Sequence, residues 1–187
     1  MFAAAALRRQ FTLYSVLGKP LFSQNTSYLF STHRNSSKMA ELLKGVDIVL
    51  SDGRTVKAEE HLKGKVVALY FSAGWCPPCR AFTPKLKAFY EKLAAAGKNF
   101  EVIFISRDRA EEDLKEYYQD HHGKWTYLPF GSPQIQDYLA KYEVKTIPSM
   151  KVIKPDGTVI VQDARTEVAV KGENAEELFE EWLAFYN

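Results

Sequence analysis

Cys76 and Cys79 are the residues of this chain whose type and spacing best suit covalent chemistry. They are the only cysteines among 187 residues, and Pro77 and Pro78 separate them. At C-x-x-C spacing, one thiol can attack a disulfide and the second can displace the product. The pair therefore predicts thiol–disulfide redox chemistry.

The segments on either side of the pair predict a strand followed by a helix. Residues 66–71 are continuously apolar, as in a buried strand of a parallel sheet. After the pair, apolar residues recur at helical spacing, namely Phe82, Leu86, Phe89 and Leu93. The first turn of a helix has unpaired N–H groups and partial positive charge, which stabilise a thiolate. We therefore expect a lowered pKa for the Cys76 thiol, which makes it the nucleophile, with Cys79 as the resolving cysteine.

The four other residues of the hexapeptide at 75–80 complete the predicted active-site loop. Pro77 and Pro78 have a fixed φ and donate no hydrogen bond, so they stiffen the loop and help to set its redox potential. Trp75 is expected to form an apolar lip beside the nucleophile, and Arg80 to add positive charge.

The two cysteines could also be ligands of a zinc site or buried and unreactive. A closed structural zinc site needs four ligands, and His121 and His122 lie 42 or more positions beyond Cys79, at no zinc-finger spacing. No metal is therefore predicted. Two buried, unreactive cysteines remain the alternative to a redox pair.

Four stretches resemble one branch of the thioredoxin superfamily. The hexapeptide WCPPCR at 75–80 resembles the active-site signature of tryparedoxins and nucleoredoxins. Pro84 falls where the superfamily's active-site helix carries a kinking proline. The segment WTYLPF at 125–130 resembles the one before the third helix, and TIPS at 146–149 resembles the cis-proline loop. The resemblance implies one α/β domain over 43–187, with a thioredoxin-like fold in which helices flank a central mixed β-sheet on both faces.

The resemblance also implies roles for particular residues. Cys76 and Cys79 would form the redox disulfide. Pro148 would be cis beside that pair, where the backbone of Ile147 could pair with an extended client, so Ile147 and Pro148 are the predicted substrate-binding residues. Thioredoxin has a buried aspartate where this chain has Tyr70, so another group must carry the proton of Cys79. The sequence does not choose that group.

The predicted function is reduction of protein disulfides through a CPPC dithiol–disulfide cycle. The resemblance implies that clients include peroxiredoxin-type peroxidases, and that a separate reductase or a low-molecular-weight dithiol regenerates the pair. The chain has no flavin or nicotinamide motif, so no cofactor is predicted. The alternative is a nucleoredoxin-like redox-sensing adaptor that binds signalling proteins in the cytosol or nucleus.

The first 38 residues differ in composition from the rest of the chain. They contain five basic residues, no acidic residue and many serines, which predicts a disordered extension that acts as a mitochondrial transit peptide. The predicted location is thus the mitochondrial matrix, whereas initiation at Met39 would give a cytoplasmic or nuclear form. A disordered tail without a targeting role is the alternative.

Charge and hydropathy argue against two classes of partner. Outside the first 38 residues, 20 basic residues stand against 23 acidic ones, so no basic patch for nucleic acid is expected. No stretch approaches 18 uninterrupted apolar residues, so no membrane span is expected.

Further elements follow from periodicity and turn residues. Strands are predicted at 46–50 and 100–106, a short helix at 58–62 and a hairpin of 149–153 with 158–161. Helices are predicted to start at a capping pair Asp108 and Glu111, at Pro133, and at a capping pair Asn174 and Glu177. Their apolar residues are expected in the core, namely Leu114, Tyr117, Tyr118, Ile135, Tyr138, Leu139, Tyr142, Leu178, Trp182 and Phe185.

Overall fold

The computed structural model describes residues 42–186, so the predicted transit segment and Met39 lie outside the described residues. The elements follow the chain in this order: β1 (Asp47–Val49), β2 (Thr55–Lys57), α2 (Ala58–His61), β3 (Val66–Ser72), α3 (Pro77–Ala95), β4 (Phe100–Ser106), α4 (Glu111–His121), β5 (Thr126–Tyr127), α5 (Gln134–Lys141), β6 (Ser149–Ile153), β7 (Val159–Val161), α6 (Ala164–Lys171), η1 (Gly172–Asn174) and α7 (Ala175–Ala184).

One mixed sheet holds all the strands, in the order β2-β1-β5-β4-β3-β6-β7. β3 runs parallel to β4, and β4 parallel to β5, whereas β6 lies antiparallel to β3. Every residue of β3 and β4 is buried, because these strands have helices on both of their faces. The continuous apolar runs in the sequence reflect this central position.

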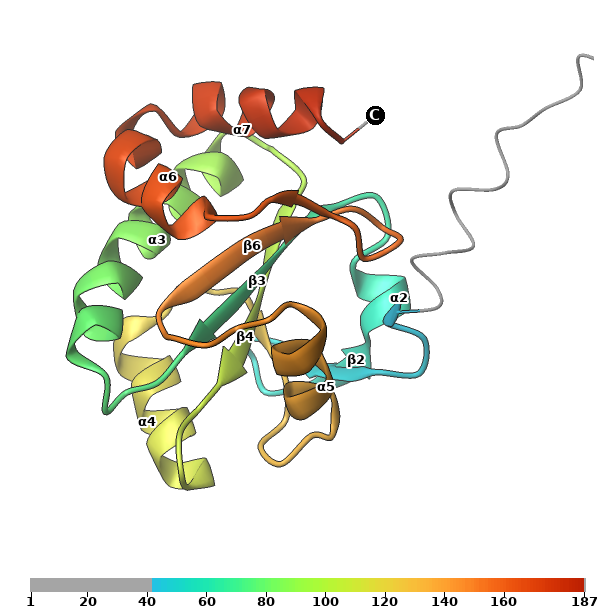
Figure 1. Ribbon diagram of the computed structural model, residues 1–187, viewed down its shortest axis with the longest axis vertical. Coiled ribbons are helices and arrows are strands. Elements are labelled where there is room, and N and C mark those ends of the chain that lie inside the picture. Colours follow the sequence, from blue (N-terminus) through green and yellow to red (C-terminus); the bar gives the residue numbers. More distant parts are fainter. Residues whose placement is uncertain (1–41, 187) are drawn as a thin grey trace, which may run out of the picture. The chain divides into compact units, whose positions relative to one another are not determined.

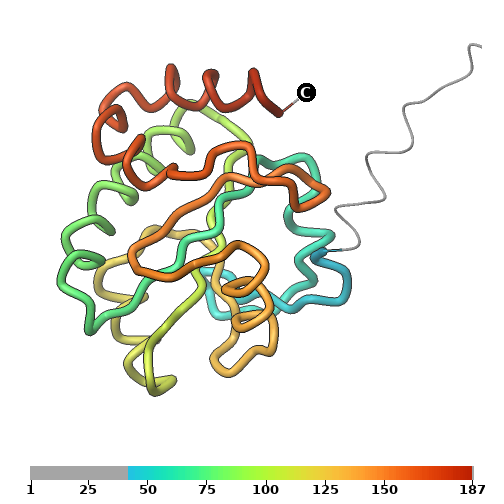
Figure 2. Tube along the Cα trace, in the orientation of Figure 1, coloured from blue at the N-terminus to red at the C-terminus, as the bar shows by residue number. Residues whose placement is uncertain are grey.

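Helices cover both faces of the sheet (Figures 1 and 2). Alternate residues of β3 point to opposite sides, so Ala68 packs with α3, α4, α6 and α7, and Leu69 packs with α2 and α5. The expectation of a mixed sheet between two helical layers is therefore confirmed. The carboxyl end of β3 leads directly into the cysteine pair at the start of α3.

Of the two predicted capping pairs, the one at Asp108 and Glu111 is wrong, whereas Asn174 is the N-cap residue of the last helix as predicted, without the expected side-chain hydrogen bond. The N-cap of α4 is Ala110 and that of α7 is Asn174, and neither forms a side-chain cap hydrogen bond. The Asp108 carboxylate instead accepts hydrogen bonds from two residues outside the helix, Gly74 and Ser106. The Asp108 side chain thus bonds to Gly74, which is distant in sequence, and not to the start of α4 as the spacing indicated.

Three further differences concern the edges of the sheet and the C-terminal end. Phe185, predicted to be in the core, follows the end of α7 and is 64% exposed. The short edge strand β2, the two-residue strand β5 between β1 and β4, and the helix α6 were not predicted. These elements are two to eight residues long and lack a strong periodic pattern, so their positions depend on pairing and packing.

His122 lies in an aromatic cluster between β4 and α4. Its Nδ1 accepts a hydrogen bond from Trp125 Nε1 at 3.2 Å, and its ring centroid lies 4.2 Å from that of Phe104 and 4.5 Å from that of Tyr117. Its Nε2 is buried and has no hydrogen-bond partner among residues 42–186. Burial lowers the pKa of His122 from 6.5 to about 3.

A His122→Gln variant is expected to be less sensitive to acid than the wild type. Between pH 6.5 and about 3 the unfolded chain protonates this histidine while the folded chain does not, so wild-type stability falls with pH in that window. The free energy of unfolding, plotted against pH, should have slopes that differ between the variant and the wild type by up to about 1.4 kcal/mol per pH unit. Urea unfolding at pH 4 to 7 measures these slopes. Parallel plots for the variant and the wild type would show that His122 does not cause the loss of stability in acid. The glutamine oxygen can still accept from Trp125.

Candidate active site

The cysteine pair occupies the N-terminus of α3. Cys76 is the N-cap residue, and its Sγ accepts a hydrogen bond from the backbone N–H of Cys79 at 3.4 Å. Pro77 and Pro78 take the first two helical positions, where a missing N–H leaves no helical bond unmade. Cys76 and Cys79 are joined by a disulfide, with their Cα atoms 5.2 Å apart. In the reduced state, the Cys79 N–H and the helix dipole would both stabilise a Cys76 thiolate.

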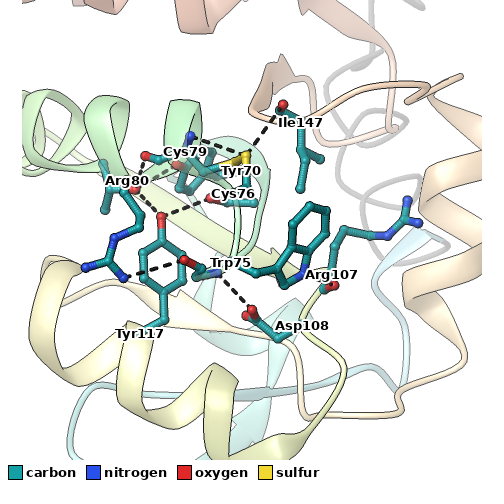
Figure 3. Close-up of a disulfide and its surroundings, with 12 residues drawn as sticks. Tyr70, Trp75, Cys76, Cys79, Arg80, Arg107, Asp108, Tyr117 and Ile147 are labelled. Carbon is teal, nitrogen blue, oxygen red and sulfur yellow. Dashed lines mark hydrogen bonds between the residues drawn. A yellow bond between two sulfur atoms is a disulfide. The ribbon is translucent and has the colours of Figure 1, made fainter.

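The two sulfurs differ in their access to solvent. Cys79 is fully buried, whereas Cys76 keeps 4% of its surface exposed. The Sγ of Cys76 lies 3.8 Å from the backbone oxygen of Ile147, and Ile147 packs against both cysteines (Figure 3). The Ile147–Pro148 peptide bond is cis. A client can therefore approach Cys76 only, past Ile147.

A Pro148→Ala variant is expected to reduce protein clients at least about tenfold more slowly, equivalent to about 1.4 kcal/mol. Proline restricts the residue before it to extended conformations, which keeps the backbone of Ile147 suited to pair with a client strand. The measurement is kcat/KM for a protein disulfide, with a small disulfide as control. Full activity toward the protein would count against this docking role.

Trp75 stands at the rim of the site and is 55% exposed. Its indole Nε1 donates to the backbone oxygen of Arg107 at 3.0 Å (Figure 3). The Arg109 guanidinium lies 5.9 Å from the centroid of the Trp75 ring. The predicted apolar lip is thus held in place by the loop between β4 and α4.

Asp108 fixes the backbone just before the cysteines. Its Oδ1 accepts from the Gly74 N–H at 2.8 Å, and its Oδ2 accepts from the Ser106 hydroxyl at 2.7 Å. Burial raises the pKa of the Asp108 carboxyl, and these two hydrogen bonds partly oppose the shift. A side chain at position 74 would bring its Cβ within 3.0 Å of Tyr117 Cβ, so glycine permits this close approach.

Arg80 lies on the exposed side of the helix start. One guanidinium nitrogen is 3.5 Å from the backbone oxygen of Gly74. The side chain borders a hollow of about 320 Å³ whose other wall is acidic, formed by α4 residues Asp113, Glu116 and Asp120. Arg80 therefore supplies positive charge next to the pair and opposite three carboxylates.

A network of neutral hydroxyl groups lies beneath the pair, where thioredoxin would have its buried aspartate. The Thr83 hydroxyl donates to the backbone oxygen of Cys79 at 2.9 Å. Its oxygen is 2.8 Å from the Tyr70 hydroxyl and 2.5 Å from that of Tyr117, so both tyrosines must donate to it. Ser72 completes the set, with its hydroxyl 3.1 Å from that of Tyr117. Burial raises the pKa of Tyr70 far above its usual value, so the Tyr70 hydroxyl stays uncharged.

Sequence reasoning placed Tyr70 at this position but missed Ser72, Thr83 and Tyr117. Tyr117 was interpreted only as part of an apolar helix face, and Ser72 and Thr83 belong to no periodic pattern. Their hydroxyls come from β3, α3 and α4 and meet only in the fold. Neither Asp108 nor Glu111 belongs to this network, although Asp108 borders the site through Gly74.

Within residues 42–186, no cluster of three or more histidine, cysteine, aspartate or glutamate residues could hold a metal ion. In the same range, no helix is both long and apolar enough to cross a membrane.

Comparison with known proteins identifies the family. A family model described as "Thioredoxin-like" matches residues 64–159, which is more than half of the chain. The tryparedoxin of Trypanosoma brucei brucei is 46% identical over 136 residues, covering 71% of this chain and 90% of that protein. This chain belongs to the thioredoxin-like family. A solved thioredoxin from Wuchereria bancrofti shares the thioredoxin-like fold, with 46% identity and a TM-score of 0.65 over 76% of this chain and 96% of that one.

This chain is also similar to part of the nucleoredoxins. Probable nucleoredoxin 1 of Arabidopsis thaliana is 41% identical over 132 residues, which is 71% of this chain. The match spans only 22% of that protein. The chain is thus a tryparedoxin- and thioredoxin-like protein with a C-x-x-C pair, and it matches a small part of the nucleoredoxin.

Proposed function

We propose that this protein reduces disulfides in client proteins. The observation that carries the proposal is the asymmetry of the pair: Cys76 reaches the surface at a helix N-terminus beside Ile147, and Cys79 is fully buried behind it. This arrangement supports attack by Cys76 and resolution by Cys79.

The cycle transfers two electrons from the pair to the client. The Cys76 thiolate attacks one sulfur of the client disulfide, which breaks that bond, forms a mixed disulfide and releases one client thiolate that takes up a proton. The Cys79 thiolate, having lost its proton, then attacks Cys76 Sγ. The Cys76–Cys79 disulfide forms, and the second client sulfur leaves as a thiol. A separate reductase or a low-molecular-weight dithiol must then supply two electrons to restore the pair.

The test is an insulin-reduction assay with dithiothreitol as the electron source. Wild-type protein should accelerate the reduction of insulin disulfides, and Cys76→Ser should return the rate to that of dithiothreitol alone. An equal rate with and without the wild-type protein would refute the proposal. Phe185→Ser is the matched surface control, because Phe185 is exposed and lies just after the end of α7, far from the cysteine pair in sequence.

We further propose peroxiredoxin-type peroxidases as clients, supported by the similarity to tryparedoxin. A coupled assay tests this proposal, with reduced protein as the sole electron donor to a purified peroxiredoxin and hydrogen peroxide as the oxidant. Peroxide consumption that depends on Cys76 supports the link. No consumption, together with normal insulin reduction, would restrict the proposal to other clients.

A redox-sensing adaptor is the second candidate, favoured by the 41% identity to nucleoredoxin 1. An adaptor would bind its partner without turning over its disulfides, and the oxidation state of the pair would control binding. Strong insulin reduction with no binding that depends on oxidation state would argue against this function.

We propose the mitochondrial matrix as the location of the full chain, based on the acid-free, serine-rich residues 1–38. The test compares a fluorescent fusion of the full chain with one that starts at Met39. Matrix fluorescence for the first and cytoplasmic or nuclear fluorescence for the second is expected. The same distribution for both would refute a targeting role.

A further inference from the structure

Two of the exposed large apolar side chains lie beside the redox site. Among residues 42–186, Trp75, Phe130, Val170 and Phe185 are the large apolar side chains with substantial exposure. Trp75 donates its indole hydrogen bond to Arg107, and Phe130 lines a hollow that Arg107 also borders. Exposed aromatic groups that gather in one place commonly mark interaction sites.

The hollow beside Phe130 has a volume of about 370 Å³. Arg107 and Asp108 form one side, and the loop from Phe130 to Pro133, together with Ile135 of α5, forms the other. Its size suits a single large apolar side chain. Phe130 is 41% exposed and available for such a contact.

The charged groups of the hollow are not equivalent. Both carboxylate oxygens of Asp108 are already used, on the Gly74 N–H and the Ser106 hydroxyl. The Arg107 guanidinium is exposed and forms no ion pair or hydrogen bond within residues 42–186. The hollow therefore offers an apolar surface next to a guanidinium that has no ion-pair partner within residues 42–186, while the Asp108 oxygens are directed to Gly74 and Ser106, which suits an apolar side chain beside a carboxylate.

The hollow is continuous with the sulfur site through one residue. The backbone oxygen of Arg107 holds the Trp75 indole, and Trp75 immediately precedes Cys76 (Figure 3). A client chain that reaches Cys76 past Ile147 can extend over Trp75, because Trp75 directly precedes Cys76 in the chain. The residues flanking its cysteine are thereby brought toward Trp75 and the hollow.

We propose that this hollow selects protein clients that carry a large apolar residue next to an acidic one, close in sequence to the reactive cysteine. The inference rests on the proposed disulfide reductase function. Phe130 and Arg107 are its specificity-determining residues: Phe130 contacts the apolar side chain and Arg107 pairs with the acid.

Synthetic peptide disulfides test the selectivity. A Phe-Glu pair is moved from one to five residues away from the cysteine, on either side, and each peptide is compared with a matched Ser-Lys peptide. For wild-type protein, at least one position of the Phe-Glu pair should give a kcat/KM about tenfold or more above that of the Ser-Lys peptide with the same spacing. Phe130→Ser should reduce this preference to about twofold or less, and Arg107→Glu should make Phe-Lys better than Phe-Glu.

Three controls separate failure of this proposal from failure of the proposed function. Phe185→Ser removes an aromatic group that is 64% exposed, compared with 41% for Phe130, and should keep the full preference. Bis(2-hydroxyethyl) disulfide, which is uncharged and too small to span the hollow, should be reduced at the wild-type rate by every variant. If wild-type protein does not reduce it, the reductase function itself fails. Thermal unfolding confirms that the variants fold.

The selectivity proposal is overturned if no register is preferred, or if Phe130→Ser keeps the preference while the small disulfide is reduced normally. It is also overturned if Phe130→Ser abolishes self-association in analytical ultracentrifugation and leaves the peptide preference intact. That result would assign the hollow to a second copy of this chain.

Discussion

A Cys79→Ser variant is expected to retain its clients as mixed disulfides on Cys76. In the proposed cycle the fully buried Cys79 displaces the client, so its loss leaves the first step intact and blocks the second. Insulin turnover should fall by at least about a hundredfold, equivalent to about 2.7 kcal/mol in activation free energy. Non-reducing electrophoresis of cell extracts should show adducts that dithiothreitol removes.

The controls for this trap follow from the geometry. A Cys76→Ser variant should form no adducts, because its remaining sulfur has no exposed surface. Equal trapping by both single variants would contradict the assigned order of attack. Adducts that contain matrix peroxidases would support both the client class and the location, whereas an empty trap with a reactive Cys76 thiolate would favour the adaptor.

A Thr83→Val variant is expected to be about 2–4 kcal/mol less stable than the wild type. Valine has nearly the shape of threonine but neither donates nor accepts a hydrogen bond. The substitution therefore leaves the Tyr70 hydroxyl without its acceptor, leaves the Tyr117 hydroxyl with Ser72 as its remaining partner, and removes the side-chain donor to the Cys79 carbonyl. Each buried polar group left without a partner costs about 1–3 kcal/mol.

Thr83→Ser is the matched control, because serine keeps the hydroxyl and should lie within about 1 kcal/mol of the wild type. Urea unfolding of the oxidised proteins measures both differences. Equal stability of Thr83→Val and Thr83→Ser would show that the network contributes little. The redox potential of the cysteine pair is a second measurement. If Thr83 positions the helical turn at Cys79, this potential should shift in Thr83→Val and not in Thr83→Ser.

The local features of the site could be predicted from the sequence. The cysteine spacing, the preceding buried strand, the two prolines and the helical periodicity from Phe82 onward are all short-range patterns. Such patterns reflect backbone preferences and burial that act within a few residues. For the same reason, the buried central strands and the helix that begins at the cysteines were predictable, and the mixed sheet followed from the family resemblance.

The tertiary structure decided what surrounds the sulfur atoms. Asp108 looked like a helix cap but hydrogen bonds to Gly74, 34 positions away. The hydroxyl groups of Tyr70, Thr83 and Tyr117 come from three elements, and the Phe130 hollow joins a loop to the end of β4. Hydrogen bonds and hollows of this kind depend on which elements pack together. The sequence by itself therefore determined the reactive pair, and only the fold decided which residues support it and shape its approach.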